Sequence, residues 1–360
     1  MSKNNKQKSR RATPWKGKSE LTATQEFLKR HYDTYYADRH RKLDERGETE
    51  MINSYIPGKC PYCEAEKYKK SGYSKNGIQR YMCSECGKTF LPTTGTIFDE
   101  HRISISEWME YSLNLFRHDN ITPETAEFPA GNSRSFERDV RITADSWSNK
   151  NDFKTSRYWL AKLFLTLEGV QDNIVLSEKV WLDETFYTVR SEDIVHKDNG
   201  DKLRGLSRNQ ICIGVATDKQ HTILFSEGTG SPSQKKTVET FMNHIQQGSK
   251  LIHDDEFAHR KLVKELNLES VVYASKDLKG LSDKKNPLNP VNSIHAILKR
   301  FLYSHSSFDR DDIQGYLNLF AFVTNPPNDM LEKVELVVKM AFQNPRLLRF
   351  RDFYASKPDF

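Results

Sequence analysis

The segment CPYCEAEKYKKSGYSKNGIQRYMCSEC, residues 60–86, contains two matched Cys-x-x-Cys pairs. Cys60 and Cys63 form the first pair, Cys83 and Cys86 form the second, and 19 residues separate them. Each pair makes a tight turn that aims two thiolates at one point, and two such turns complete a tetrahedral site for Zn²⁺. The spacing therefore predicts a small module built around one structural zinc ion.

The residues between the pairs are basic and aromatic, and a Lys75-Asn76-Gly77 turn divides them into two strand-like runs. This layout is typical of a zinc ribbon. Two disulfides are the alternative, but no signal peptide precedes the pairs, and small disulfide scaffolds rarely lie inside long soluble chains. Because a ribbon usually reads nucleic acid or protein while attached to something larger, the rest of the chain has to define the function.

The composition predicts a soluble, intracellular protein. Its 360 residues suffice for two or three domains, and no apolar run approaches the roughly 18 residues needed to span a membrane. The 55 Lys and Arg residues against 49 Asp and Glu leave a net charge of +6, so the surface is not uniformly basic. The asymmetry is local, because seven Lys or Arg and no acid precede Glu20. Such an arm is most often a solvated tail, although it could contact phosphates.

Helices are expected before and after the ribbon. Residues 20–50 predict a polar helix that ends near Gly47. After the ribbon, Ser104 could cap a helix with Glu107 reaching back to it. Another helix is expected to open at residue 155, and a further helical run covers residues 331–342 of the C-terminal tail.

The segment between residues 100 and 168 predicts short helices joined by polar turns. This pattern fits a helix-turn-helix module, with Ser156-Arg157-Tyr158 at the start of the recognition helix. Any three-helix bundle gives a similar pattern, so the segment by itself does not decide whether this region binds DNA.

From residue 171 the pattern changes to short strands and helices. Strands are expected at residues 180–182, 210–216, 222–225, 250–253 and 270–274, with helices at 238–245 and 260–266. The early strands are close enough for antiparallel hairpins, whereas the later ones need helical crossovers. The order therefore predicts an α/β fold with a mixed sheet. Cys212, inside an apolar run, is expected in its core.

Acidic residues follow two of these strands. Asp183 ends the first strand and Asp254 ends the fourth. One acid at a strand end is more often a turn or cap residue, but two on neighbouring strands would meet at one edge, where ligands bind. Adjacent carboxylates are unfavourable without a positive partner, so we expect a hard divalent cation there. Three neighbouring acids are alternative ligands: Glu184, Asp255 and Glu256. Asp255 could instead cap the helix that follows.

A further helix is expected from Asn289 to Arg300, where apolar residues recur at helical spacing. Asn292, His295 and Lys299 share its polar face, since they fall at i, i+3 and i+7. An Asn early in a helix is usually a cap, and a Lys two turns later is usually solvated. The residues alone therefore leave their role open.

Taken together, these segments resemble the bacterial insertion-sequence transposases that carry an N-terminal zinc ribbon, a helix-turn-helix segment and a DDE-type ribonuclease H-like domain. The resemblance spans roughly residues 55–325. The matching stretches are Cys60–Phe90, Thr94–Phe98, Trp181–Thr185, Ile252–Glu256, Val291–Arg300 and Gly315–Phe320.

We therefore expect a multidomain chain of five regions. They are a basic arm and helix (1–54), the zinc ribbon (55–93), a helical helix-turn-helix DNA-binding region (94–170), a ribonuclease H-like catalytic domain (171–325) and a C-terminal helical tail (326–360).

The resemblance implies a catalytic site made of Asp183, Asp254, Asn292 and Lys299. The third acid of such enzymes is usually Glu, but here the matching position is Asn292, with Lys299 seven residues later. This pattern is similar to the branch whose signature is Asp-Asp-Asn followed by Lys. Asp183 would bridge two Mg²⁺ (or Mn²⁺) ions, Asp254 would hold one and Asn292 the other. Lys299 would contact a DNA phosphate, and His295 would orient a water or phosphate or have a structural role.

The implied activity is that of a DNA transposase, which cuts at the transposon ends and transfers the released 3′-hydroxyl to a target strand. Double-stranded DNA is the implied partner, and synapsis of two ends implies a homodimer or a higher assembly, located in the cytoplasm at the nucleoid. A catalytically inactive, transposase-derived DNA-binding protein is the alternative. A transcription-factor-like zinc protein is disfavoured, because binding DNA does not require the strand-rich half.

Overall fold

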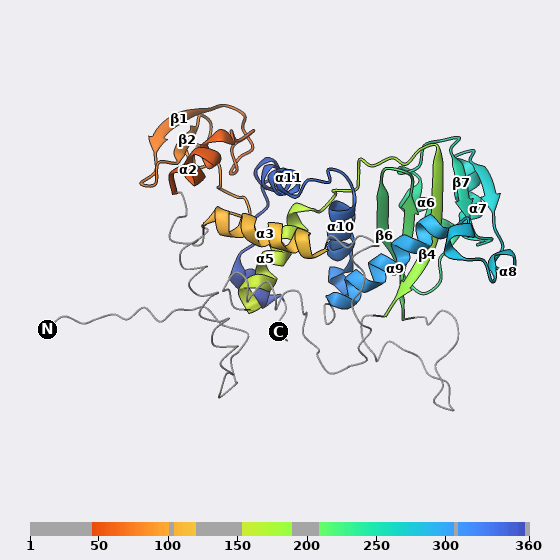
Figure 1. The fold of residues 1–360 in the computed structure, drawn as a ribbon. Coiled ribbons are helices and arrows are strands. Elements are labelled where there is room, and N and C mark those ends of the chain that lie inside the picture. Colours follow the sequence, from red (N-terminus) through yellow and green to blue (C-terminus); the bar gives the residue numbers. More distant parts are fainter. Residues whose placement is uncertain (1–44, 101–103, 120–152, 189–208, 306–308, 357–360) are drawn as a thin grey trace, which may run out of the picture. The chain divides into compact units, whose positions relative to one another are not determined.

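The structure is a computed structural model that describes residues 45–100, 104–119, 153–188, 209–305 and 309–356. The chain divides into two compact units, whose elements are labelled in Figure 1. Unit 1 comprises Met1–Leu115, Ile142–Thr166 and Val334–Phe360, and unit 2 comprises Phe116–Arg141 and Leu167–Lys333. Two helices contribute residues to both units, α3 (Ile105–Asp119) and α11 (Met330–Gln343).

Unit 2 is built on a five-stranded mixed sheet with the order β6-β5-β4-β7-β8. Its strands are β4 (Lys179–Tyr187), β5 (Ile211–Thr217), β6 (Thr222–Thr229), β7 (Lys250–His253) and β8 (Glu269–Val272). The first three pair antiparallel, whereas β7 runs parallel to both β4 and β8. Numbered from β4, the strand order is 3-2-1-4-5, which is the order of ribonuclease H-like sheets, so the predicted mixed α/β sheet is present.

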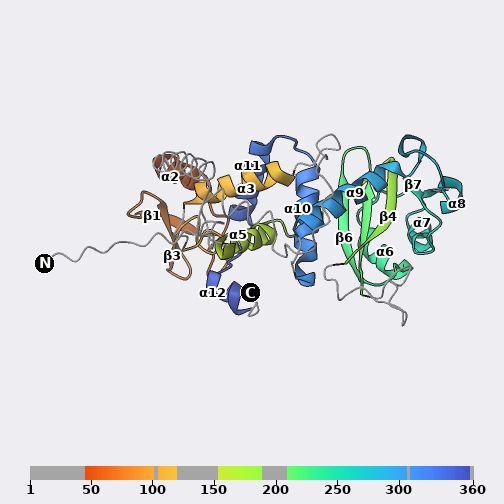
Figure 2. The ribbon, with the colours of Figure 1, turned by 60° about the horizontal axis from the view of Figure 1, so that its bottom comes forward.

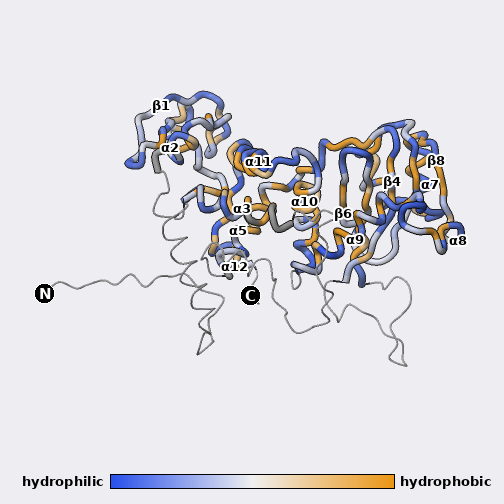
Figure 3. Tube along the Cα trace, in the orientation of Figure 1, coloured by the Kyte–Doolittle hydropathy of each residue, from blue (hydrophilic) through white to orange (hydrophobic). Residues whose placement is uncertain are grey.

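Helices cover both faces of this sheet. Successive residues of β4 point to opposite sides, so each face of the strand contacts a different layer of helices. On one face, α6 (Gln234–Phe241) and α7 (His259–Glu265) pack in a core with Leu182. On the other face, α9 (Asn289–Ser304) lies across β4 and β5 (Figure 2). The Tyr187 hydroxyl donates to the Leu302 carbonyl. Hydrophobic stretches follow the strands between these layers (Figure 3).

Shorter elements complete unit 2. A helical turn, α8 (Ser275–Leu278), and the 3-10 turn η3 (Asp283–Lys285) connect β8 to α9. A second 3-10 turn, η4 (Arg310–Asp312), leads into α10 (Ile313–Thr324), which packs against β6. Most residues of α10 are buried, as expected for a helix inside the core.

The strands and helices predicted for this half are present, with one consequential difference. The strand-end position predicted for Asp183 is wrong, because β4 continues past it to Tyr187. Thr185 and Tyr187 are buried, and they extend the pattern of alternate buried residues beyond the apolar run that marked the strand in the sequence. Cys212 is fully buried in β5, as predicted.

Unit 1 contains the ribbon, a three-stranded antiparallel sheet of β1 (Tyr68–Tyr73), β2 (Gln79–Cys83) and β3 (Thr89–Phe90). Its small core joins cysteines to aromatic rings, since Tyr81 packs against Tyr68 and Phe90 at centroid distances of 5.2 and 5.7 Å. A sheet this small needs more than its apolar contacts to be stable.

A helix, α2 (Glu45–Ser54), supports the ribbon turn. The Asn53 side chain donates to the Gly77 carbonyl at 3.0 Å and accepts from the Gln79 backbone N–H at 2.8 Å. The expectation that this helix ends near Gly47 is wrong, because Ile52 is buried and Asn53 is held by the ribbon. Residues 20–44 of the predicted helix lie outside the described residues.

The rest of unit 1 consists of parts of α3 and α11 with α5 (Phe153–Thr166) and α12 (Phe350–Ala355). As predicted, Ser104 caps α3 by accepting from the Glu107 N–H, at 3.3 Å. The helical run predicted for residues 331–342 is α11.

The helix-turn-helix module is not confirmed. Residues 120–152, between α3 and α5, lie outside the described part of the chain. Ser156 is fully buried, and the Tyr158 hydroxyl donates to the Leu348 carbonyl at 2.6 Å, so the start of α5 packs inside unit 1. The five predicted regions likewise remain a prediction. Within the described ranges, no helix has the length and apolar character needed to cross a membrane.

Candidate metal centres

The four paired cysteines meet at one point in the ribbon. Their sulfur atoms all lie within 4.8 Å of one another, with Cys60 and Cys86 at 3.7 Å and Cys63 and Cys83 at 3.6 Å. Four thiolates at about 2.3 Å from a tetrahedral zinc ion would be about 3.8 Å apart. The described cysteines are free of disulfides. The sulfur geometry therefore fits a Zn²⁺ ion of the predicted kind.

Local backbone geometry makes the two cysteine turns alike. The residue after each pair, Glu64 or Gly87, has a positive φ, of 61° and 68° respectively, which turns the chain away from the sulfurs. In the second turn, the N–H groups of Cys86 and Glu85 point at the Cys83 sulfur, at 3.5 and 3.4 Å. These hydrogen bonds lower the Cys83 pKa to about 7, which favours the thiolate that binds metal.

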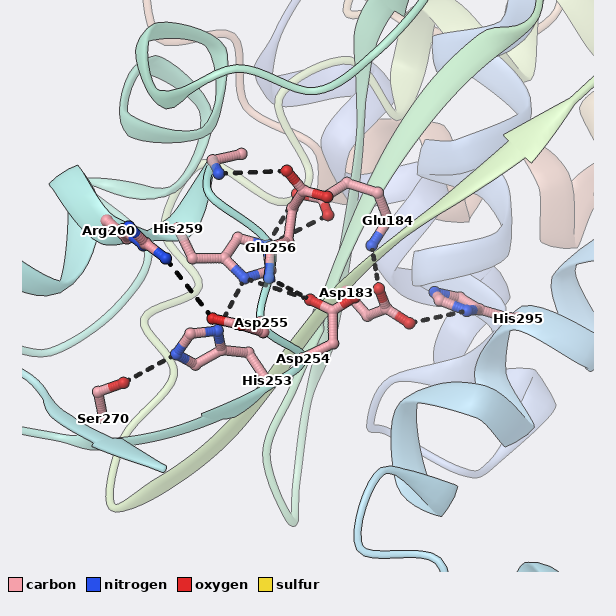
Figure 4. A network of polar contacts seen from close by, with 11 residues as sticks. Asp183, Glu184, His253, Asp254, Asp255, Glu256, His259, Arg260, Ser270 and His295 are labelled. Carbon is pink, nitrogen blue, oxygen red and sulfur yellow. Dashed lines mark hydrogen bonds and ion pairs between the residues drawn. The ribbon is translucent and has the colours of Figure 1, made fainter. Parts of the chain in front are cut away.

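The two predicted site aspartates lie side by side in unit 2. The parallel register ends with Trp181 opposite Ile252, and two residues further along lie Asp183, within β4, and Asp254, directly after β7. Asp183 accepts from the backbone N–H of Glu184 at 2.9 Å, and Asp254 accepts from that of Glu256 at 3.0 Å (Figure 4). Both carboxylates are thereby oriented by local backbone hydrogen bonds.

Electrostatics at this position favours a bound cation. Burial, together with the charges of Asp254 and Glu184, raises the pKa of Asp183 to about 7. Burial also raises the pKa of Asp254. Carboxyl groups that ionise with difficulty in the free protein would be stabilised in their charged form by a divalent cation, whose preferred ligands are carboxylate oxygens.

Helix α9 brings His295 to this pair. Its Nδ1 atom lies 3.8 Å from Asp183 Oδ2, whereas its Nε2 atom is buried and has no hydrogen-bond partner. Burial and the nearby Lys299 lower the pKa of His295 to about 4, so the ring is neutral. Asn292 lies one turn earlier, half-buried, and Lys299 is exposed one turn later. The structure thus places Asp183, Asp254 and His295 together, with the predicted Asn292 and Lys299 on either side along the same helix.

A chain of polar side chains lies behind the aspartates and was not predicted from the sequence. His259 Nε2 lies 3.0 and 3.1 Å from the two Glu184 carboxylate oxygens, and its Nδ1 lies 3.0 Å from Nδ1 of His253. His253 Nε2 in turn lies 2.9 Å from Ser270 Oγ. Figure 4 shows this chain running from β4 through α7 and β7 to β8.

Burial and the neighbouring charges shift the pKa values of the two histidines in opposite directions. Burial disfavours the charged form of His259, but the hydrogen bond and charge of Glu184 raise its pKa overall. Burial and the charge of His259 lower the pKa of His253 to about 4. His259 Nδ1 also lies 3.9 Å from Asp254 Oδ1, which links the chain to the site. Of the alternative ligands, Asp255 is exposed and pairs with Arg260 at 3.7 Å, on the outside.

A further acid, Glu227 on β6, is buried with neither carboxylate oxygen hydrogen-bonded. Burial, with the charge of Glu184, raises its pKa to about 7. The sequence gives only two signals for the polar chain behind the aspartates. An acid follows each aspartate, and two histidines lie six residues apart, but neither pattern is a specific spacing motif.

Comparisons with known proteins show that this chain is similar to proteins of transposable elements. Residues 175–325 match the ISXO2-like transposase domain family. A protein in the transposable element ISH50 of Halobacterium salinarum, itself described as uncharacterized, is 23% identical over 271 residues, which cover 72% of this chain and 83% of that protein.

Solved structures similar to this chain come from the Mos1 mariner transposase. Its catalytic domain is 13% identical with a TM-score of 0.28, covering 51% of this chain and 94% of that one. The Mos1 paired end complex with Mn is 11% identical with a TM-score of 0.26, covering 73% and 90%. The assignment rests on the family match. Residues 175–325 therefore resemble the ISXO2-like transposase domain, and the resemblance of this chain to insertion-sequence transposases is confirmed.

Proposed function

We propose that the protein is a transposase that binds the ends of its element and catalyses metal-dependent cleavage and transfer of DNA strands. Its match to the ISXO2-like transposase domain and its relative from a transposable element support the class of protein. The observation that carries the proposed chemistry is that Asp183 in β4 and Asp254, directly after the parallel neighbour β7, follow the same paired register by two residues each.

Each residue of the site has a proposed task. Asp183 and Asp254 would hold Mg²⁺ or Mn²⁺, with Asn292 adding a neutral oxygen ligand. A divalent cation bound there supplies charge neutralisation at the phosphate and activation of the attacking oxygen. Lys299 is exposed on α9 and would contact a DNA phosphate as a point charge. His295 is neutral and buried beside Asp183, which suits it to orient that carboxylate.

The ribbon would hold one structural zinc ion through its four cysteines and contribute to binding of the transposon ends. Basic residues on its exposed strand support this role, since Lys69 and Lys70 on β1 are solvent-exposed. Two ends must be brought together for transfer, so we expect the active form to be a homodimer or a larger assembly on double-stranded DNA.

The alternative is a protein that binds the same DNA but no longer cuts it. The neutral Asn292 at the position where Glu is usual supports this alternative, because an amide holds a cation less strongly than a carboxylate. DNA binding would then be independent of the aspartates, whereas a transposase needs both.

Two adjacent acids provide a matched test of the proposal. Purified full-length Asp254→Asn should lose Mg²⁺-dependent cleavage of DNA carrying the element's terminal repeats and still bind those ends. Asp255→Asn removes the same charge from an exposed side chain and should cleave like wild type. Equal cleavage by both variants would contradict the proposed site, and a wild type that binds but never cleaves would favour the inactive alternative.

A further inference from the structure

The contacts from Glu184 to Ser270 form one continuous chain with a consistent set of donors and acceptors. A carboxylate oxygen accepts, so His259 donates from Nε2 to Glu184, whose two oxygens lie at 3.0 and 3.1 Å. One proton lies between the two facing Nδ1 atoms of His259 and His253, and the remaining nitrogen of His253 bonds to the Ser270 hydroxyl. The histidine rings and the carboxylate are buried, where hydrogen bonds are electrostatically strong.

A metal ion between the two histidines is a competing explanation, since His253, Asp254 and His259 have ligand atoms within 4.8 Å of one another. The distances favour the hydrogen bond. Two imidazole nitrogens on a tetrahedral zinc ion at about 2.0–2.1 Å would be about 3.3 Å apart. The observed Nδ1–Nδ1 distance is 3.0 Å, while His259 Nδ1 to Asp254 Oδ1 is 3.9 Å, which is too wide for the same ion.

The chain is attached to the backbone directly beside each site aspartate. Glu184 follows Asp183, and its own N–H holds the Asp183 carboxylate. His253 precedes Asp254 at the end of β7. Because adjacent strand residues point to opposite faces, Glu184 anchors to α7 while Asp183 faces α9. The same polar chain thus fixes β4, α7, β7 and β8 immediately behind the two carboxylates.

We propose that the Glu184–His259–His253–Ser270 chain is a positioning device that sets the separation of Asp183 and Asp254 for a divalent cation. This inference rests on the proposed function and adds a set of residues that act through the aspartates. Groups that orient metal ligands typically change metal affinity by about 10–100-fold when they are removed. Breaking the chain should therefore weaken cation binding while the fold and the ribbon zinc are retained.

Binding of Mn²⁺ to the full-length protein, followed by electron paramagnetic resonance, gives the direct test. Glu184→Leu removes the acceptor for His259 and should weaken Mn²⁺ binding at least about tenfold. Glu184→Gln keeps an oxygen that can accept from His259 Nε2 and should recover most of the affinity. His244→Gln is the control, since His244 is bonded to the Ile174 carbonyl elsewhere in unit 2 and should leave Mn²⁺ binding unchanged.

A kinetic readout separates positioning from loss of folded protein. In DNA cleavage, Glu184→Leu should raise the Mn²⁺ concentration that gives half-maximal rate, and saturating Mn²⁺ should restore much of the rate. A simple loss of folded enzyme would lower the maximal rate and leave that concentration unchanged, which would overturn the inference. If Glu184→Leu does not fold, Ser270→Ala decides the question, because Ser270 is exposed and its removal leaves the core intact. Unchanged Mn²⁺ affinity in Ser270→Ala would then overturn it.

The remaining outcomes are distinguishable. If Asp183→Asn binds Mn²⁺ as wild type does, or if neither binds it, the proposed function fails. If wild type has that site and Glu184→Leu binds Mn²⁺ equally well, only the positioning inference fails. Zinc analysis showing two ions per chain, one of them lost in His259→Gln, would overturn the inference in favour of a histidine metal site.

Discussion

His295 Nδ1 lies 3.8 Å from Asp183 Oδ2, so a buried, neutral imidazole of α9 faces a carboxylate of β4. Asn292, which the family resemblance implies as the third ligand, is half-buried one helical turn away. His295 and Asn292 are thus one turn apart on α9, and substitutions can separate their contributions.

Substitutions at Asn292 should show whether it is the third ligand. We expect Asn292→Ala to lower Mg²⁺-dependent DNA cleavage by more than about 100-fold, because removing a ligand should exceed the effect of removing a group behind one. Asn292→Asp restores an oxygen and should retain part of the activity. Cleavage rates under single-turnover conditions measure both. Full activity in Asn292→Ala, combined with loss in His295→Ala, would transfer the ligand role to His295.

Removing one ribbon cysteine should release the predicted zinc. We expect about one zinc ion per chain in wild type by elemental analysis and less in Cys83→Ser, because three thiolates bind zinc less well and a small ribbon depends on its metal for folding. Cys212→Ala is the matched control, since Cys212 lies in the core of unit 2. A zinc-free but fully folded and active Cys83→Ser protein would refute the ribbon assignment.

The stability of unit 2 should depend on the protonation of Glu227. Its folded-state pKa is raised from 4.5 to about 7, so its contribution is fully present below about pH 4.5 and is lost as the pH rises through 7. Glu227→Gln removes this loss. The free energy of unfolding of the variant relative to wild type should increase by up to about 3 kcal/mol between pH 4.5 and 8. Denaturant unfolding at several pH values measures the difference, and a pH-independent difference would show that the folded-state pKa of Glu227 is not raised.

Any side chain at Gly214 should destabilise unit 2. A Cβ atom there would lie 2.7 Å from the Phe241 ring and 2.8 Å from Glu227 Oε1. We expect Gly214→Ala to destabilise the protein by about 1–3 kcal/mol through overpacking. Gly58→Ala is the control, because a Cβ at Gly58 meets no atom within 4 Å. Equal urea midpoints for the two variants would show that the sheet and α6 separate easily.

Much of the architecture follows from local sequence patterns. The cysteine spacing predicts the ribbon because both ligands of each pair are close in sequence, and the apolar runs identify all five strands of unit 2. The length of β4 was missed because Asp183 and Glu184 interrupt the apolar pattern within the strand. The polar residues of the candidate site thus make the strand look shorter to a hydrophobicity-based prediction than it is.

The polar chain behind the site could not be predicted for a different reason. Glu184 and His259 are 75 residues apart, and their contact depends on α7 packing against the sheet. Their spacing carries no motif, and buried charges are recognisable only once burial is known. Glu227, likewise, is distinguished only by its missing partners.

The central claim is that Asp183 and Asp254 form a cation site for cutting DNA. The most direct measurement is Mg²⁺-dependent cleavage of DNA carrying the element's terminal repeats by purified wild type and Asp183→Asn, with binding to the same ends measured in parallel. We predict that wild type cuts at the ends, and that Asp183→Asn binds them with similar affinity and does not cut. Equal inertness of the two proteins, with both bound to the ends, would contradict the claim.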